Sequence, residues 1–357
     1  MRPRWPRTFE LLVERGKNDP VIETVDYHTG GEPFRIVPEP PVSIPGDSVA
    51  DRRARAMLTG TAADELRKLL CFEPRGHADM YGGFIVPPDD EGAHLGVLFW
   101  HKDGFSTACG HGTIALGTWA IESGLVATDP SGTTDVMIDV PSGRVTARVH
   151  TDPGGEVDRV EFINVASRLI ATDIAVTTGR GDCSIDLVWG GAIYACLDAS
   201  DVGLTVAPEY VTDLIALGRD VKAALAGDSR IEHPTDPRLS GVYGTIIYDD
   251  LGRLPSGELH QRNVTIFADG QVDRSPCGSG TAARVAALHA TSRLAADQTF
   301  VHDSIVGSTF RAHIAELTIE HGEPAVIPVV SGTAHLVARS TFVVDPSDAL
   351  TPGFTLR

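Results

Sequence analysis

The sequence predicts a mixed α/β protein built from two related halves. Three observations indicate it. Short apolar runs typical of strands alternate with a few segments typical of helices. The chain has 37 glycines and 23 prolines among 357 residues, which is typical of many tight turns between short strands. One stretch of sequence also recurs about half a chain later.

The individual elements follow from periodicity and from turn residues. Strands are expected over 21–28, 34–37, 82–86, 95–101, 136–140, 144–150, 159–165, 184–190, 244–250, 263–269 and 335–344. Helices are expected over 47–70, 112–124, 206–227 and 280–294. The Arg-rich segment 1–17 carries Glu10 and Glu14 and has no apolar core, so it is interpreted as a solvated tail or first helix rather than a targeting peptide.

Composition excludes several classes of protein. A net charge of −18 argues against nucleic-acid and anionic-membrane partners, because both require a basic face. No stretch reaches the roughly 18 to 20 apolar residues that cross a bilayer. The cysteines form no C-x-x-C pair, and their odd number favours a reducing compartment, hence a cytoplasmic protein. They are Cys71, Cys109, Cys183, Cys196 and Cys277.

The internal repeat relates residues 95–124 to residues 262–294. Both run from a strand through an Asp-Gly turn and a loop to Cys-Gly-x-Gly-Thr-x-Ala and an Ala-rich helix. Residues 79–86 and 241–248 form a weaker echo of each other before these segments. The repeat therefore predicts two similar halves, each with a cysteine at the start of a helix.

A cysteine at a helix start lies near free backbone N–H groups and the positive end of the helix dipole. This placement is expected to lower its pKa from about 8.5. The neighbouring glycines leave N–H groups unshielded, so each turn could also hold a carboxylate. Two such turns facing each other would place one sulfur on each side of a small acid. One thiolate could then remove a proton from carbon while the opposite thiol donates one, which inverts the centre without a cofactor.

Five segments, in this order, resemble the proline racemase family. They are DYHTGGEPFRIV (26–37), EPRGHADMYGG (73–83), ACGHGTIALG (108–117), DLVWGGAIYA (186–195) and DRSPCGSGT (273–281). The resemblance runs from about residue 21 to the C-terminus. The family includes proline racemases, 4-hydroxyproline 2-epimerases and trans-3-hydroxy-L-proline dehydratases. It implies a diaminopimelate epimerase-like fold, in which two pseudo-symmetric halves each wrap a curved sheet round a central helix.

We accordingly expect a first half over 20–158 and a second half over 159–334, with 335–357 packing back on the first half. The resemblance implies that Cys109 and Cys277 are the acid/base pair. It implies that the substrate carboxylate is held by backbone N–H groups of Gly110, His111, Gly278 and Ser279. It further implies that Asp273 binds the ring amine and that Tyr81 and Phe267 pack on the pyrrolidine ring. No metal or other cofactor is expected, and a homodimer is the family-level expectation.

Three functions stay open. Racemases and epimerases of the family usually keep both thiols, so Cys109 and Cys277 favour inversion at Cα of proline or 4-hydroxyproline. Segments such as MYGGFIVPP (80–88) resemble dehydratases as closely, so dehydration of trans-3-hydroxy-L-proline is the alternative. A module that binds proline-like acids without turnover is the third, although binding alone needs no mirrored thiols.

Some of these residues also have simpler interpretations. Asp273 could cap the following helix or hold its loop, and Tyr81 and Phe267 could be core aromatics. The turn 28–31 either lines the pocket or is structural. Arg75, His77 and Asp79 are expected to form a buried polar network.

Other chemistry finds little support in the sequence. Cys71, Cys183 and Cys196 lie in or after apolar runs and are interpreted as core thiols. The C-x6-R spacing from Cys277 to Arg284 is one residue too long for a phosphatase loop. The glycine turns lack the third glycine of a dinucleotide site, and no cluster has metal-ligand spacing.

Overall fold

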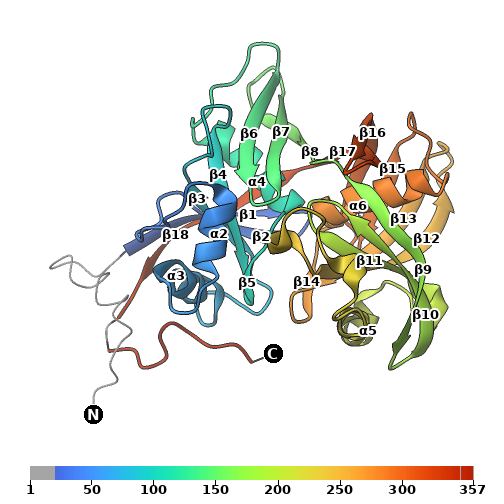
Figure 1. Ribbon diagram of the computed structural model, residues 1–357. Helices are drawn as coiled ribbons and strands as arrows, with labels where there is room; N and C mark the ends of the chain where they lie inside the picture. Colours follow the sequence, from blue (N-terminus) through green and yellow to red (C-terminus); the bar gives the residue numbers. More distant parts are fainter. Residues whose placement is uncertain (1–20, 346, 357) are drawn as a thin grey trace.

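A computed structural model of the protein describes residues 21–345 and 347–356. The segment 1–17, interpreted above as a tail or first helix, lies outside the described residues. The described chain forms two halves that stand side by side (Figure 1). None of the described helices is both long and apolar enough to span a membrane.

The first half is a curved sheet with the strand order β18-β1-β2-β3-β4-β6-β7-β8. Its strands are β1 (Val21–Thr29), β2 (Glu32–Val37), β3 (Gly82–Val86), β4 (Leu95–His101), β6 (Thr133–Val140), β7 (Gly143–Thr151), β8 (Val157–Ile163) and β18 (Ala334–Val343). The β2–β3 and β4–β6 pairs are parallel, and the others are antiparallel. The short strand β5 (Gly104–Phe105) folds back on β4.

The second half repeats this topology, with the order β9-β10-β11-β12-β13-β15-β16-β17. Its strands are β9 (Arg168–Thr178), β10 (Gly181–Trp189), β11 (Ile193–Asp198), β12 (Val242–Arg253), β13 (Leu259–Phe267), β15 (Phe300–Ser304), β16 (Thr309–Glu320) and β17 (Glu323–Gly332). The parallel pairs, β11–β12 and β13–β15, fall at the equivalent places, and β14 (Gln271–Asp273) folds back on β13. Pairing of β8 with β17 joins the halves into one sheet.

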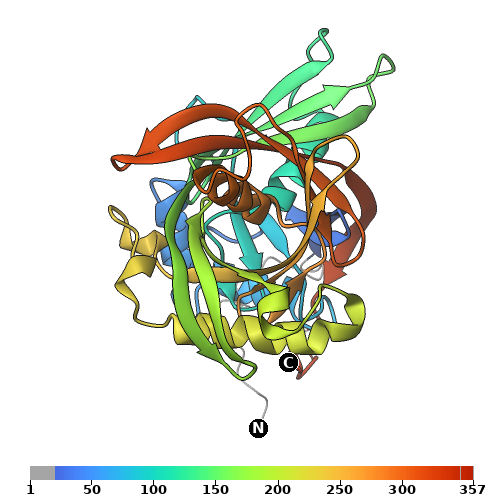
Figure 2. The same ribbon diagram turned by 90° about the vertical axis from the view of Figure 1, so that its right-hand side faces the viewer.

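Each curved sheet encloses one central helix. The first half contains α4 (Gly110–Glu122) and the second contains α6 (Gly278–Ala290). Figure 2 shows α6 surrounded by strands of its half. Nearly every residue of both helices is buried, which matches their lack of a polar face. The expected architecture of two pseudo-symmetric halves, each with a sheet round a central helix, is confirmed.

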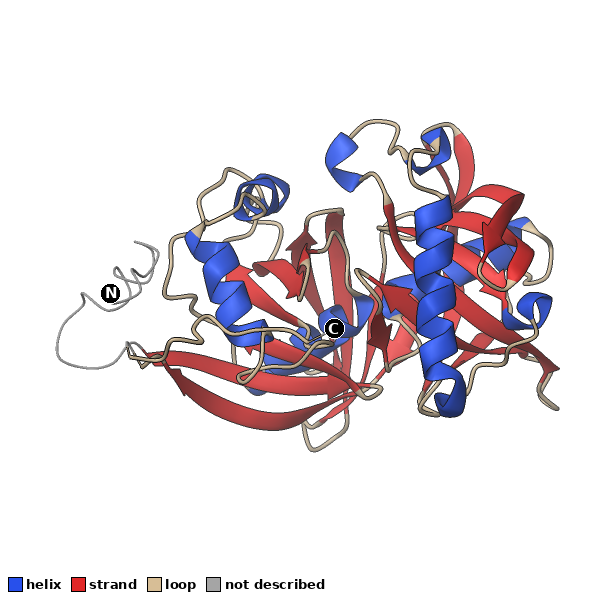
Figure 3. Ribbon diagram, turned by 90° about the horizontal axis from the view of Figure 1, so that it is seen from below, coloured by secondary structure: helices blue, strands red, loops and turns tan. Residues whose placement is uncertain are grey.

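The peripheral helices differ in detail from the expectation. The single helix expected over 47–70 is divided into α2 (Val49–Ala56) and α3 (Ala62–Cys71). The break between α2 and α3 contains Gly60, whose backbone lies in the left-handed region at φ +77°. The Thr61 side chain then caps α3. The long helix in front of the second half in Figure 3 is α5 (Val211–Ala224), which packs on β9, β12 and β13. A 3-10 turn, η2 (Pro208–Tyr210), precedes α5. The other 3-10 turns are η1 (Ala199–Val202), η3 (Ser229–Ile231) and η4 (Pro237–Leu239).

Two crossings connect the halves. The boundary expected between residues 158 and 159 falls inside β8, which pairs with β7 in one half and β17 in the other. Near the end of the described chain, β18 returns to the first half and pairs along the whole length of β1. Several strands were not expected from the sequence, among them β9, β15, β16 and β17. Some outward positions of β9 and β16, such as Asp173 and Arg311, carry charged residues, which interrupt the apolar signal.

Candidate active site

The N-termini of α4 and α6 meet end to end between the halves. A Cβ atom on Gly110 would lie 2.5 Å from Cα of Gly278, and one on Gly278 would lie 2.6 Å from Cα of Gly110. Both distances are too short for any side chain, so only glycine allows this approach. Because Cys109 and Cys277 directly precede these glycines, the two expected acid/base residues come to one junction.

Each turn also makes room for its own sulfur. A Cβ atom on Gly112 would lie 2.8 Å from Sγ of Cys109, and one on Gly280 would lie 2.8 Å from Sγ of Cys277. The Gly112 N–H donates to Sγ of Cys109 over 3.2 Å. The two glycines of Cys-Gly-x-Gly therefore have separate steric roles: the first permits the helix–helix contact, and the second accommodates the sulfur.

Four amides at this junction are available to a ligand. Within the part of the chain that the structure describes, the N–H groups of Gly110, His111, Gly278 and Ser279 donate to no protein acceptor. They belong to the first turns of two helices, where N–H groups have no partner inside the helix. The positive ends of both helix dipoles converge on the same point. Such a cradle suits an anion the size of a carboxylate.

The thiol pKa values differ from the expectation. Cys109 and Cys277 are only 4% and 5% exposed. Burial raises the pKa of Cys109 well above its usual value, and the Gly112 N–H lowers it by less. Burial also raises the pKa of Cys277, and the nearby Asp273 charge adds to the rise. Desolvation of a thiolate thus outweighs the hydrogen bonds that favour it, and the expectation of lowered thiol pKa values is wrong for this closed arrangement.

Asp273 lies at the end of β14, beside the sulfurs, and is 3% exposed. Its Oδ1 accepts hydrogen bonds from Ser275, from N–H at 2.9 Å and from the hydroxyl at 2.7 Å. The Ser275 hydroxyl oxygen accepts from the Cys277 N–H at 3.0 Å. Asp273 therefore holds the loop before α6, which is the structural role considered for it in the sequence analysis. Burial raises its pKa to about 6, so it is still ionised at neutral pH.

Tyr81 and Phe267 belong to a cluster of rings, with 5.8 Å between their centroids. Tyr243 stacks on Phe267 at 5.7 Å, and its hydroxyl lies 3.1 Å from the Tyr81 hydroxyl. His101 meets Phe267 edge-on at 5.8 Å. Burial lowers the pKa of His101 to about 3, so the ring is neutral.

Sequence reasoning missed Tyr243 and His101, although the repeat held the signal for both. The echo of 79–86 in 241–248 aligns Tyr243 with Tyr81. Alignment of the two Asp-Gly turns places His101 opposite Phe267. The ring cluster is therefore itself composed of two pairs that the duplication relates.

The flanks of the two sulfurs are not alike. Nδ1 of His111 lies 3.4 Å from Sγ of Cys109, and burial lowers the pKa of His111 to about 3. On the other side, the Tyr194 hydroxyl lies 2.7 Å from Oγ of Ser279 and 3.8 Å from Sγ of Cys277. Tyr194 lies within the segment 186–195 that resembles the family, but no pattern in the sequence singled it out.

Residues of the first half hold the loop that carries Asp273 and Cys277. The Arg274 N–H donates to Oε2 of Glu32 at 2.7 Å, and its guanidinium pairs with Asp79 at 2.8 Å. Glu32 was not singled out from the sequence. Its carboxyl group is completely buried, and burial raises its pKa well above the usual value. Both halves are therefore needed to position the second cysteine.

The remaining expectations are met in part. Of the network expected from Arg75, His77 and Asp79, Arg75 points to Asp348 at 3.5 Å and Asp79 contacts Arg274 at 2.8 Å. The Asp79 N–H does donate to Nδ1 of His77 at 3.2 Å.

In the turn 28–31, the Thr29 hydroxyl donates to the His111 carbonyl at 3.0 Å, next to the site. The expected core thiols are buried and free: Cys71, Cys183 and Cys196. Among the described residues, no three His, Cys, Asp or Glu side chains are placed to hold a metal ion.

Comparison with known proteins identifies the family. Residues 24–355 match the family described as proline racemase. A 3-hydroxyproline 2-epimerase of Burkholderia multivorans is 44% identical, over 94% of this chain and 98% of that protein. A trans-3-hydroxy-L-proline dehydratase of Burkholderia ambifaria is also 44% identical, with the same coverage.

Among solved structures, a hydroxyproline epimerase from Agrobacterium vitis with bound trans-4-OH-L-proline superposes with a TM-score of 0.85. It is 31% identical, and the match covers 94% of this chain and 96% of that chain. The fold of the described chain agrees with this likeness. The chain belongs to the proline racemase family.

Proposed function

We propose that this protein inverts Cα of a hydroxyproline by proton transfer between Cys109 and Cys277, without a cofactor. One observation carries the proposal: two equivalent cysteine turns meet head-on, with a buried sulfur on each side of the shared amide cradle. Inversion needs a proton acceptor on one face of the carbon and a donor on the other. A binding protein would need neither.

The amides of Gly110, His111, Gly278 and Ser279 would hold the substrate carboxylate. Hydrogen bonds there stabilise the charge that flows toward the carboxylate when the Cα proton leaves. Asp273, ionised at neutral pH, would bind the ring nitrogen. Tyr81 and Phe267 would contact the ring carbons and exclude water.

The protons balance in a single exchange. The Cα–H bond breaks as one thiolate takes its proton, and the opposite thiol gives its own proton to the other face of Cα. The substrate leaves inverted, and the two sulfurs have exchanged roles. Because burial raises the pKa of both thiols, the thiolate would form while the halves are apart and hydrated. Closing on a substrate with a cationic ring nitrogen then supplies a compensating charge.

The relatives sharpen the expected substrate. The Burkholderia multivorans relative is named for 3-hydroxyproline, whereas the Agrobacterium vitis structure holds trans-4-OH-L-proline. We therefore place 3-hydroxyproline first, ahead of 4-hydroxyproline and proline.

Dehydration of trans-3-hydroxy-L-proline is the second candidate, because several relatives carry that name. In this substrate the hydroxyl and the carboxylate lie on opposite faces of the ring, so the hydroxyl and the Cα proton share a face. One sulfur could take the Cα proton and return it to the departing hydroxyl, which leaves as water. The opposite sulfur would not be needed.

Proton NMR in D2O separates these functions. Trans-3-hydroxy-L-proline, trans-4-hydroxy-L-proline and L-proline are supplied separately. Loss of the α-proton signal together with inverted product establishes the epimerase and ranks its substrates. Consumption of trans-3-hydroxy-L-proline to an unsaturated product, without inversion of any substrate, establishes the dehydratase. Absence of exchange with all three would contradict the proposed substrate class.

Two further expectations belong to this proposal. The resemblance supports a homodimer, which light scattering of the purified protein tests directly. All five cysteines are free in the structure, which supports a reducing compartment such as the cytoplasm.

A further inference from the structure

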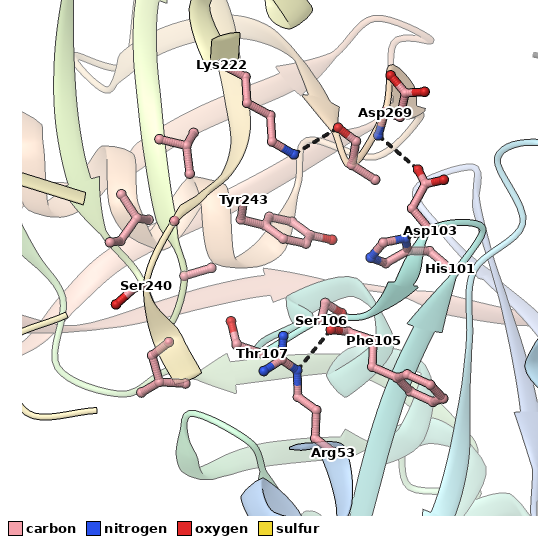
Figure 4. Close-up of a pocket in the computed structure, with 16 residues that line it drawn as sticks. Arg53, His101, Asp103, Phe105, Ser106, Thr107, Lys222, Ser240, Tyr243 and Asp269 are labelled. Carbon is pink, nitrogen blue, oxygen red and sulfur yellow. Dashed lines mark hydrogen bonds between the residues drawn. The ribbon is translucent and has the colours of Figure 1, made fainter. Parts of the chain in front are cut away.

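A cavity of about 390 Å³ lies between the halves, next to the ring cluster. Figure 4 shows Tyr243 projecting into its centre and His101 at one side. Ser106 and Thr107, just before Cys109 in the chain, form part of its wall. Neither sulfur lines the cavity, but Ser106 and Tyr243 in its wall both contact or lie close to Tyr81 of the ring cluster.

Two cations point into this cavity from opposite sides, Lys222 from α5 and Arg53 from α2 (Figure 4). Nζ of Lys222 donates to the Ala268 carbonyl at 2.9 Å. Nε of Arg53 donates to the Phe105 carbonyl at 2.9 Å, and Nη1 donates to the Arg238 carbonyl at 3.1 Å. Neither cation forms an ion pair with any residue in the described ranges, so no contacting carboxylate neutralises them.

This arrangement is unusual in so acidic a chain. The net charge of −18 repels anions from most of the surface. Burial lowers the pKa of both Lys222 and Arg53, as expected for cations held partly out of water. A bound anion would relieve that cost. The wall also carries Asp103 and Asp269, so it offers both signs of charge.

We propose that this cavity is a vestibule that binds the carboxylate of an amino-acid zwitterion on its way to and from the thiols. Arg53 and Lys222 would hold the carboxylate, and the acids on the wall would face the ring nitrogen. The volume lies within the roughly 300–1,000 Å³ typical of small-molecule sites. The identity of the ligand rests on the proposed function, whereas the preference for an anion does not.

The test compares two alkylating reagents of nearly equal size, anionic iodoacetate and neutral iodoacetamide. Their rates of reaction at Cys109 and Cys277 are followed by peptide mass spectrometry. The vestibule favours the anion, so the iodoacetate-to-iodoacetamide rate ratio should fall about fivefold in Lys222→Gln and in Arg53→Gln. Lys222→Glu should lower the ratio further.

The ratio of the two alkylation rates separates the effect of charge from the effect of access to the sulfurs. Arg53 reaches Arg238 across the halves, so its loss could loosen the closed state. Loosening would speed both reagents together and leave their ratio unchanged. Arg148→Gln is the matched control, because it removes one exposed cation on β7, away from the cavity.

A ratio in Lys222→Gln and Arg53→Gln equal to that of Arg148→Gln would overturn the vestibule. So would complete protection of both sulfurs from either reagent, because then no route from this cavity exists. Alkylation requires no turnover, so this result stands apart from the NMR experiment. A protein that exchanges no hydroxyproline but shows the expected ratios would contradict the proposed function alone.

Discussion

The two halves share strand order, central helix and cysteine turn, but the backbone at the two cysteines differs. Cys109 has extended backbone, with φ −157°, and its sulfur caps α4. Cys277 has φ +63°, in the left-handed region that non-glycine residues rarely occupy. The Ser275 and Asp273 hydrogen bonds hold that strained turn in place. The second cysteine is thus positioned by a side-chain network from its own loop, whereas the sulfur of the first caps the helix that follows it.

The halves also differ in charge beside the sulfurs. Asp273 lies opposite Thr265 on the β13–β14 hairpin. When the Asp-Gly turns of the two halves are aligned, Phe99 corresponds to Thr265. The N–H of Ser106 donates to the carbonyl of Phe99, so Ser106 occupies the position equivalent to Asp273. A neutral hydroxyl thus stands where the other half has a carboxylate. Duplication supplies the mirrored thiols and amides, and under the proposed function this asymmetry of charge would decide which way a ring nitrogen faces.

The largest effects should come from the sulfurs. Cys109→Ala and Cys277→Ala should each reduce inversion by about 10³-fold, because in the proposed function each thiol carries the proton on one face of Cα. Chiral chromatography of the product measures it, with the core variant Cys196→Ala as control. If one variant keeps full inversion, the two turns do not act as a pair. Retention of dehydration in only one variant would favour the second candidate function.

Asp273→Asn should lower kcat/KM by about 100-fold, as expected for loss of a buried charge partner. In the unmodified protein, kcat/KM should fall as the pH drops through about 6, where Asp273 takes up a proton. The variant should lack this fall. The exposed Asp158→Asn is the control. If kcat/KM of Asp273→Asn still fell as the pH dropped through about 6, the fall would belong to the titration of another group.

The same variant should be more stable than the unmodified protein at pH 8. The folded protein binds the Asp273 proton more tightly than the unfolded chain does, since the pKa is raised from 3.8 to about 6. The ionised carboxylate therefore destabilises the fold above pH 6, and this cost disappears as the pH falls through 6 toward 4. Urea unfolding at pH 8 and pH 4 measures the difference, which should shrink at the lower pH. Greater stability at pH 4 only would contradict this sign.

Gly110→Ala and Gly278→Ala should destabilise the protein by similar amounts, about 1–3 kcal/mol, because each forces two backbones apart. Both should also reduce turnover, since the amide cradle spans the displaced junction. Chemical unfolding of the two variants side by side is the measurement. A neutral effect in either variant would show that the helix ends do not touch.

The smallest effects are expected at the ring cluster. Tyr81→Phe and Tyr243→Phe each lose one buried hydroxyl, and a lost hydrogen bond changes KM by about two- to tenfold. Tyr81→Phe should change KM more than Tyr243→Phe does, because the Tyr81 hydroxyl contacts both Ser106 and Tyr243. Steady-state kinetics of the two variants would reveal a reversed order, which would mean that Tyr243 contacts the ligand directly.

The duplicated turn made much of the site predictable. A cysteine followed by two glycines at a helix start is a local pattern, so Cys109 and Cys277 could be placed from the sequence alone. Tyr243 could have been found by carrying the same repeat one step further. Tyr194 and Glu32 could not, because their relevance arises from contacts between distant segments. The prediction of lowered thiol pKa values was wrong for a related reason. The sequence shows that each cysteine lies at a helix N-terminus, but it does not show how deeply the thiol is buried, and burial raises the pKa.

In the fold, too, features with a clear local sequence pattern were predicted and the others were not. Strands with an unbroken apolar run, such as β3 and β4, match their expected bounds. Strand β16, in which exposed polar residues such as Arg311 and His313 alternate with buried apolar ones, was overlooked. The helix expected over 47–70 was broken by a single glycine, whose left-handed conformation no periodicity reveals.

The return of β18 to β1 has a consequence for biosynthesis. Strand β1 is among the first parts of the described chain to leave the ribosome, and its partner β18 is among the last. The second half draws all its strands from residues 168–332, so its sheet can be assembled while the first still has an open edge. Open edges recruit foreign strands, and β1 of the nascent first half remains such an edge until β18 pairs with it. Translation that stops short of residue 334 would leave that edge uncovered permanently.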